Sequence, residues 1–206
     1  MLTIYHRQIT EKALQDRFSP RALEAIIAGN IGLDTLRGQI GHDEYHFDNN
    51  AFAASTAFIE AERARVPAAI GTGDLLAAWT AFGRLTHTAQ DFYAHSNYVS
   101  LWRAAHPESA PDEIEPLNGS LLNAPGLRSG RLYYPLEALS FIPGIKKWVI
   151  PLLPKDSHAR MNLDSPERGE AFAYAFSAAV KRTRHEYERT LSGLGEAGKA
   201  VFHDTP

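Results

Sequence analysis

The chain has no cysteine among its 206 residues. Disulfide bonds and thiolate metal sites are therefore both excluded, and any bound metal must be held by nitrogen and oxygen ligands. Positive charge is also scarce, because 21 Lys and Arg residues stand against 24 Asp and Glu residues, for a net charge of -3. This balance disfavours a broad electrostatic contact with nucleic acid, so we do not expect a nucleic-acid partner.

Long apolar runs are absent as well. No stretch of the sequence reaches the roughly 20 apolar residues that a transmembrane helix needs. The segment Met1–Arg7 shows no basic region followed by an apolar run, which a secretory signal would require. We therefore expect a cytoplasmic protein with no signal peptide or transmembrane segment, while export by a route that reads no such signal stays open.

The sequence also lacks the Val- and Ile-rich alternation that is typical of strands. Its apolar residues instead recur at helical spacing, and Ser19-Pro20 and Ser165-Pro166 form typical helix starts. The helix from residue 21 is expected to stop at Gly29-Asn30, and that from residue 49 before Pro67. The expected helices cover residues 10–17, 21–28, 49–65, 73–102 and 171–191, with a loop over 31–48.

Prolines concentrate in one part of the chain. Eight of the 12 prolines lie between His106 and Asp156, where long regular helices are therefore disfavoured. We predict an all-α fold: one helical-bundle domain over residues 1–206, with a Pro-rich irregular insertion at about 106–156 before the last helix.

The strongest candidate for a site is the stretch from His87 to His95. Steps of four residues advance about 400° around an α-helix, so His87, Asp91 and His95 lie in one narrow stripe. Imidazole nitrogens and a carboxylate one turn apart are ligands that zinc binds, and the carboxylate can bridge two ions. An amphipathic helix with two surface histidines is the alternative interpretation of the stripe.

Other parts of the chain supply matching groups at helix margins and in loops. These further candidates are His6, Asp34, His46 and His158. Asp34 could instead cap loop amides, and Asp43 and Asp48 are competing carboxylates in the same loop. His42, His106, His185 and His203 have no motif around them and are interpreted as ordinary surface residues.

With these motifs in order, the sequence resembles the zinc-dependent phospholipase C and nuclease superfamily. The closest likeness is to its bacterial and fungal branch, which includes Het-C-like proteins and zinc metallophospholipases. The likeness rests on five stretches: His6–Thr10, Gly29-Asn30 with Asp34, His46–Asn49, His87–Val99 and His158–Pro166.

The resemblance implies two or three zinc ions and a phospholipase C-like enzyme that hydrolyses a phosphodiester in phospholipid headgroups with metal-activated water. It implies one ion held by His46, His87 and Asp91, a second by His95 and His158, and a third that binds His6 and is bridged by Asp91. Asp34 would orient or deprotonate the attacking water. Where the family has a glutamate four residues after its histidine, this chain has Asn162, so either Asp164 or Glu170 substitutes for it or this site binds metal weakly.

Two function classes compete with this expectation: a single-strand-specific nuclease of the same fold, and a degenerate relative with a structural metal site. Within the insertion, Leu139–Pro154 is apolar with Lys146, Lys147 and Trp148 in its middle. It is either a buried loop over the bundle or an interfacial segment that contacts a membrane peripherally.

Overall fold

The computed structural model describes residues 1–140, 142 and 144–204. Within these ranges the regular structure is helical, with no named strand and two isolated β-bridges, Ser96 to Ser129 and Arg131 to Ser157. The predicted all-α, single-domain fold is thus confirmed. None of the described helices is both long enough and apolar enough to span a membrane.

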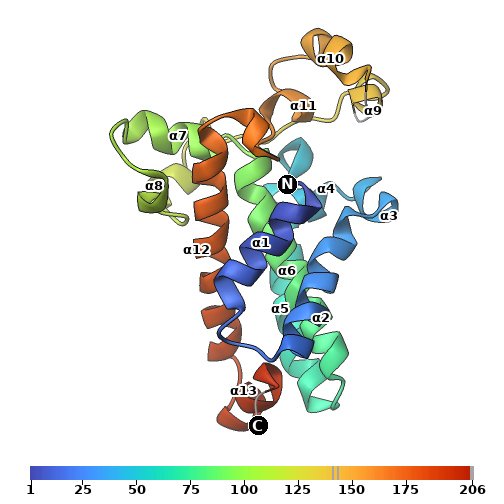
Figure 1. Cartoon of the computed structure of the whole chain (residues 1–206), viewed down its shortest axis with the longest axis vertical. Coiled ribbons are helices and arrows are strands. Elements are labelled where there is room, and N and C mark those ends of the chain that lie inside the picture. The colour runs from blue at the N-terminus through green and yellow to red at the C-terminus, as the bar shows by residue number, and fades with distance from the viewer. Residues whose placement is uncertain (141, 143, 205–206) are drawn as a thin grey trace.

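One helix stands at the centre of the bundle, with four others around it (Figure 1). The central helix is α6, and its neighbours contact it along its length. The five are α1 (Thr3–Leu14), α2 (Pro20–Ile31), α5 (Phe52–Gly71), α6 (Leu75–His95) and α12 (Ala171–Ser192). Every residue from Leu85 to His95 in α6 is buried, so the polar stripe of this helix lies in the interior.

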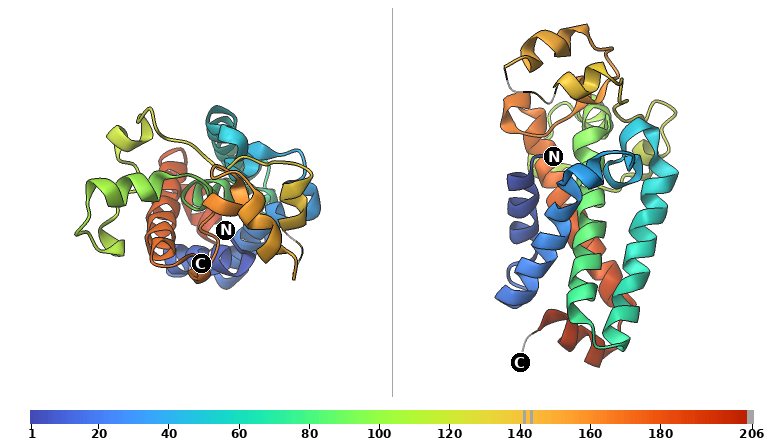
Figure 2. Two further views of the ribbon diagram at one scale, coloured as in Figure 1. Left: turned by 90° about the horizontal axis from the view of Figure 1, so that it is seen from above. Right: turned by 90° about the vertical axis from the view of Figure 1, so that its right-hand side faces the viewer.

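Shorter helices close the two ends of the bundle. Those at or beside the end with the amino terminus include α3 (Leu36–Gln39), α4 (Asp43–His46), α7 (Tyr98–Ala105), α8 (Gly119–Leu122), α9 (Leu136–Ser140), α10 (Lys146–Val149) and α11 (His158–Met161). Helix α13 (Glu196–His203) lies at the opposite end (Figure 2). Short 3₁₀ turns cover Gly32–Asp34, Asp48–Asn50, Pro111–Glu113, Ile150–Leu152 and Pro166–Arg168.

Helices α2 and α6 approach each other through two glycines. A Cβ on Gly29 would lie 2.7 Å from the Thr80 carbonyl oxygen, and one on Gly83 would lie 2.1 Å from that of Ile26. The prediction that Gly29 and Asn30 end the helix is therefore wrong. Gly29 serves the contact with α6, and Asn30 is buried with its side chain donating to Thr86 Oγ1 at 3.1 Å.

Several other predicted boundaries are also wrong. The first helix begins at Thr3, well before residue 10, and α5 continues through Pro67 to Gly71. The expected helix over 73–102 is two helices, because Ser96 is extended (φ -101°, ψ 166°) and its hydroxyl donates to the Phe92 carbonyl. The expected loop over 31–48 contains α3 and α4.

The described residues of the proline-rich insertion are irregular, as predicted, and form only short helices. The helix after it, α12, is not the last, because α13 follows. Phe202 of α13 is fully buried, and its carbonyl accepts a hydrogen bond from Trp79 Nε1 at 2.8 Å. This contact fixes α13 against the start of α6.

Candidate metal centre

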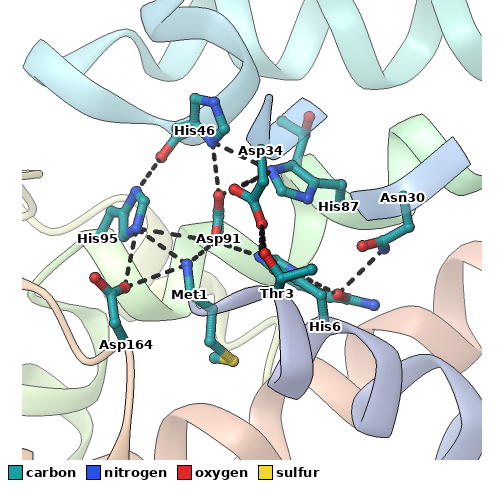
Figure 3. Close-up of polar contacts among 12 residues, drawn as sticks. Met1, Thr3, His6, Asn30, Asp34, His46, His87, Asp91, His95 and Asp164 are labelled. Atoms are coloured by element: carbon teal, nitrogen blue, oxygen red, sulfur yellow. Dashed lines mark hydrogen bonds and ion pairs between the residues drawn. The ribbon is translucent and has the colours of Figure 1, made fainter. Parts of the chain in front are cut away.

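Histidines and aspartates of three groups meet around the end of α6 that carries His95, and Figure 3 shows the first two groups with His95 and Asp164. Helix α6 contributes the stripe predicted from the sequence, and four other segments add side chains to it. The three groups are His46, His87 and Asp91; His6, Asp34 and His87; and Asp48, His95 and His158.

The first group is the tightest. His46 Nδ1 lies 2.9 Å from Asp91 Oδ2 and 3.2 Å from His87 Nε2, while His87 Nε2 lies 3.1 Å from the same carboxylate oxygen. Zinc–nitrogen bonds of about 2.0–2.1 Å in a tetrahedron place neighbouring donor atoms about 3.3 Å apart. The three donor atoms therefore already have the spacing of a zinc ligand set.

His6 approaches the other oxygen of the same carboxylate. Its Nε2 lies 3.2 Å from Asp91 Oδ1, and its ring stacks on that of His87 with centroids 4.2 Å apart. Asp34 is more distant, since its oxygens lie 4.0 Å from His6 Nε2 and 3.9 Å from His87 Nε2. Asp91 thus stands between two sets of histidines, the position that a bridging carboxylate requires.

The third group joins the helix end to two loops. Asp48 Oδ1 lies 2.8 Å from His158 Nδ1 and 3.5 Å from His95 Nδ1. On the other side of the His95 ring, Nε2 lies 3.2 Å from Asp164 Oδ1. His95 therefore links Asp48 and His158 to Asp164.

Hydrogen bonds on the outer sides of the rings orient the histidines. His6 Nδ1 lies 2.7 Å from Gln90 Oε1, which can only accept, so the proton sits on Nδ1 and the buried Nε2 lone pair faces Asp91. His46 Nε2 faces the Gly38 carbonyl at 3.3 Å, which in the same way leaves Nδ1 free to bind. Metal-binding histidines are characteristically held by such an outer hydrogen bond.

The centre contains several charged groups although it is buried. Burial would raise the pKa of Asp91, but the N-terminal ammonium, His95 and His87 together hold that pKa well below its usual range. In this structure the ammonium of Met1 lies 2.5 Å from Asp91 Oδ1 and 3.2 Å from Asp164 Oδ1. Burial acts to lower the pKa of this amine, but the carboxylates of Asp164 and Asp91 stabilise its charged form. The pKa of the amine therefore rises to about 11.

His87 and His95 differ in their protonation. Burial and the neighbouring His6 lower the pKa of His87 to about 4, so its imidazole is neutral at pH 7, the form that binds a metal. Burial also acts to lower the pKa of His95, but the carboxylates of Asp91 and Asp48 raise it well above the usual value. A cation bound beside His95 would therefore have to displace a proton.

A sharp turn after α4 places His46 and Asp48 on the same side. Phe47, Asn49 and Asn50 all have positive φ, of 59°, 53° and 59°. The turn is stabilised from the facing loop, because the Asn49 and Asn50 side-chain oxygens accept from the backbone N–H groups of Leu132 and Ser129, each at 2.8 Å. Such conformations persist where the surroundings hold them in place.

The centre opens into a pocket of about 430 Å³. Asp34, His46, Asp48, His95, His158 and Asp164 line its polar side. Its apolar side includes Leu2, Ile40, Leu132, Tyr134 and Ala138. A molecule that entered the pocket would meet carboxylates and imidazoles at one wall and hydrocarbon at the other.

The structure brings together all of the predicted site residues: His6, Asp34, His46, His87, Asp91, His95, His158 and Asp164. Of the two replacements considered for the family glutamate, Asp164 lies at the centre. Glu170 does not, because its side chain is 87% exposed and pairs with Arg103. Asn162 is turned to structural contacts, donating to the His158 carbonyl and accepting from Arg168 Nε.

Sequence reasoning missed two functional candidates. Asp48 was considered only as a rival to Asp34, although it follows His46 by two residues and pairs with His158. Gln90 was overlooked entirely, since a glutamine within a helix gives no sequence signal of the histidine it faces. His185, interpreted as a surface residue, is exposed on α12.

A family model for the VWA7 N-terminal domain matches residues 2–110, just over half of the chain. The chain belongs to the VWA7 N-terminal domain family. Comparison with curated proteins and with solved structures gives no significant match. The matched range includes His6, Asp34, His46, Asp48 and the α6 stripe, whereas His158 and Asp164 lie beyond it.

This family membership corrects the assignment made from sequence motifs. The chain was placed with the zinc-dependent phospholipase C and nuclease superfamily, but the matching family is another one. The assignment was therefore wrong, and the functions inferred through it, phospholipase C-like hydrolysis and the nuclease and degenerate-relative alternatives, fall with it. Most of the motifs behind that assignment are short and contain a single histidine, so their order along the chain did not identify the family.

Proposed function

We propose that this chain is a zinc-binding domain whose centre holds two or three ions and serves a zinc-dependent hydrolytic reaction. The observation that carries the proposal is the convergence of His46 Nδ1, His87 Nε2 and Asp91 Oδ2 at 2.9–3.2 Å from one another. Three like-charged or lone-pair-bearing atoms held so close in a buried site favour a shared cation between them.

The choice of zinc follows from the donor set. The chain has no thiolate, and each group combines one carboxylate with two imidazoles. Imidazole with carboxylate suits zinc and other first-row transition metals better than Ca²⁺ or Mg²⁺, which prefer oxygen ligands throughout. His46, His87 and Asp91 would hold one ion, and Asp91 also faces His6. Asp48, His95 and His158 would hold another, beside Asp164.

Access from outside supports a reaction over a purely structural metal role. Structural zinc sites are closed by their four ligands, whereas this centre forms one wall of the pocket. Zinc bound there supplies Lewis acidity, which lowers the pKa of water and attracts negatively charged substrate oxygens. The acidic walls would otherwise repel an anionic substrate.

Asp34 is the residue we assign to proton transfer. Its side chain is 12% exposed, lines the pocket and is the most distant carboxylate from its histidine neighbours. Thr3 Oγ1 donates to Asp34 Oδ2 at 3.2 Å and so orients the carboxylate, leaving Oδ1 able to accept a proton from a molecule in the pocket.

The test is elemental analysis of protein purified without added metal, for which we expect more than one zinc per chain. Asp91→Asn should lose metal and melt at a lower temperature, because metal bound only to the folded state stabilises it. His185→Ala, on the exposed face of α12, is the matched control and should change neither. Asp34→Asn should retain most of the zinc and lose roughly 10²-fold in turnover of chromogenic esters.

The proposal fails if the protein contains no transition metal and takes up none on reconstitution. Equal metal content and melting temperature in Asp91→Asn and His185→Ala would also contradict it. Full zinc occupancy without turnover of any ester, or turnover that chelator does not affect, would support the metal site and contradict the proposed reaction.

A further inference from the structure

The apolar segment of the insertion forms a distinct projection beyond the bundle. We call residues 136–140, 142 and 144–152 the apical segment. It comprises α9, α10 and the 3₁₀ turn Ile150–Leu152 and lies beyond the end of the bundle that carries the candidate metal centre (Figures 1 and 2). We infer that this segment is a docking surface for an anionic lipid membrane, a role independent of the proposed zinc chemistry.

The segment exposes much of the large apolar side-chain surface that the structure leaves in water. Trp148 is 71% exposed and Leu152 is 72% exposed, the two highest values among the large hydrophobic residues that the structure describes as exposed. Seven of those 12 residues lie between Tyr134 and Leu152. Contiguous apolar surface on a protein marks a place of interaction. The alternative prediction, a loop buried over the bundle, does not account for these exposures.

The base of the segment is firmly attached, so its exposure is built into the fold. Val149 and Leu153 are buried with Ala159 in a small core of their own. Glu137 is fully buried, and its Oε1 accepts the backbone N–H of Ala159 at 2.6 Å. The inner side of the segment is thus packed and hydrogen-bonded, while Trp148 and Leu152 point to solvent.

Charge identifies the partner. Lys146, Lys147 and Lys155 are exposed, whereas Glu137, the one acidic residue from 136 to 155, is buried beneath the segment. A positively charged projection on a chain of net charge -3 matches an anionic surface. Lysine is depleted at protein–protein interfaces, whereas lysine beside exposed tryptophan and leucine is typical of segments that lie at a bilayer surface.

Lys147 and Trp148 place a positive charge directly beside an exposed aromatic ring. The Lys147 ammonium lies 5.4 Å from the centre of the Trp148 ring. An indole that enters the headgroup region would carry the ammonium to the level of the lipid phosphates, where the aliphatic stem of the lysine can follow the apolar surface. Ala138 of the segment lines the pocket beside Leu132 and Tyr134, which precede the segment, so docking would turn the pocket toward the membrane.

The experiment is co-sedimentation of the full chain with vesicles of phosphatidylcholine alone or mixed with phosphatidylserine. We expect binding to the mixed vesicles and little to the neutral ones. Trp148→Ala should lower the bound fraction roughly tenfold, and Lys147→Glu should do so on the mixed vesicles. Leu76→Ala, at an exposed position, and Lys199→Glu, at a half-buried one, lie at the far end of the bundle; they are the controls and should bind like the wild type.

Tryptophan fluorescence gives a second readout. Trp79 and Trp102 are buried, at 3% and 5% exposure, so a blue shift on adding vesicles would report Trp148. The inference is overturned if mixed vesicles bind no protein, or if Trp148→Ala binds as well as Leu76→Ala. It is also overturned if the protein dimerises without lipid and Trp148→Ala abolishes the dimer, since the surface would then serve a second copy. Zinc content is measured separately, so either proposal can fail alone.

Discussion

Gln90 shows how a residue with no reactive group can orient a ligand of the candidate metal centre. Its Oε1 accepts from His6 Nδ1, and its amide nitrogen donates to Thr10 and Thr183 hydroxyls at 3.2 and 3.0 Å. The donor bonds fix which end of the amide faces His6. The amide therefore selects the tautomer of His6 that directs Nε2 toward Asp91.

We predict that Gln90→Met lowers zinc affinity by about 10- to 100-fold, because His6 loses the partner that orients it. Gln90→Glu keeps an acceptor for His6 Nδ1 and should retain affinity. Chelator competition measures both, with exposed Gln15→Met as the matched control. Equal losses in the two Gln90 variants would show that Gln90 acts only by packing.

At the level of single residues, the sequence predicted which side chains meet at the centre but not how they are held. Spacing along a helix is a local property, so the stripe of His87, Asp91 and His95 was visible directly. The contact of Asp48 with His158 joins residues 110 positions apart, and no local pattern encodes it. Asn162 illustrates the same limit, because its role depends on Arg168 and on the turn after α11.

The predicted helix boundaries are wrong where tertiary contacts override local preferences. Glycine is typical of a helix end, yet α2 continues past Gly29. Helix α6 packs so closely there that only a residue without a Cβ fits. Pro67 lies inside α5, where a proline forfeits one backbone hydrogen bond that the rest of a 20-residue helix can tolerate. The long helices were largely predictable from apolar spacing, since the outer helices of the bundle each bury one face against their neighbours.

We predict that Gly83→Ala destabilises the protein by about 1–3 kcal/mol, because its Cβ would lie 2.1 Å from the Ile26 carbonyl oxygen and force α2 away from α6. Gly71→Ala is the matched control in another helix, where an added Cβ meets nothing within 4 Å. That change should be neutral or stabilising by up to about 1 kcal/mol. Urea denaturation measures both. Equal effects would mean that the two helices can separate without loss.

At the scale of the whole molecule, a buried ionic cluster lies apart from the candidate metal centre. This second cluster joins α5 to α12 through Glu186, which is bound by both Arg63 and Arg182. All three side chains are at most 15% exposed. The family match covers α5 but ends before α12, so this second cluster spans the matched and unmatched parts of the domain. It holds together the bundle on which the centre is built.

The second cluster makes stability depend on pH in a defined way. Burial acts to raise the pKa of Glu186, but the charges of Arg182 and Arg63 outweigh it and hold the pKa below 4.5. A carboxyl group whose pKa is lower in the folded state stabilises the fold above its unfolded pKa. That contribution is lost as the pH falls from about 4.5 through the folded pKa.

We therefore predict that Glu186→Gln destabilises the protein by about 3 kcal/mol at neutral pH, because two arginines remain buried without their anion. The difference in unfolding free energy between wild type and variant should stay constant from about pH 8 to pH 6 and shrink as the pH falls below about 4.5. Exposed Glu188→Gln on the same helix should change stability by less than about 0.5 kcal/mol throughout. A difference for Glu186→Gln that grew toward acid pH would reverse the sign of this linkage and refute the role assigned to the cluster.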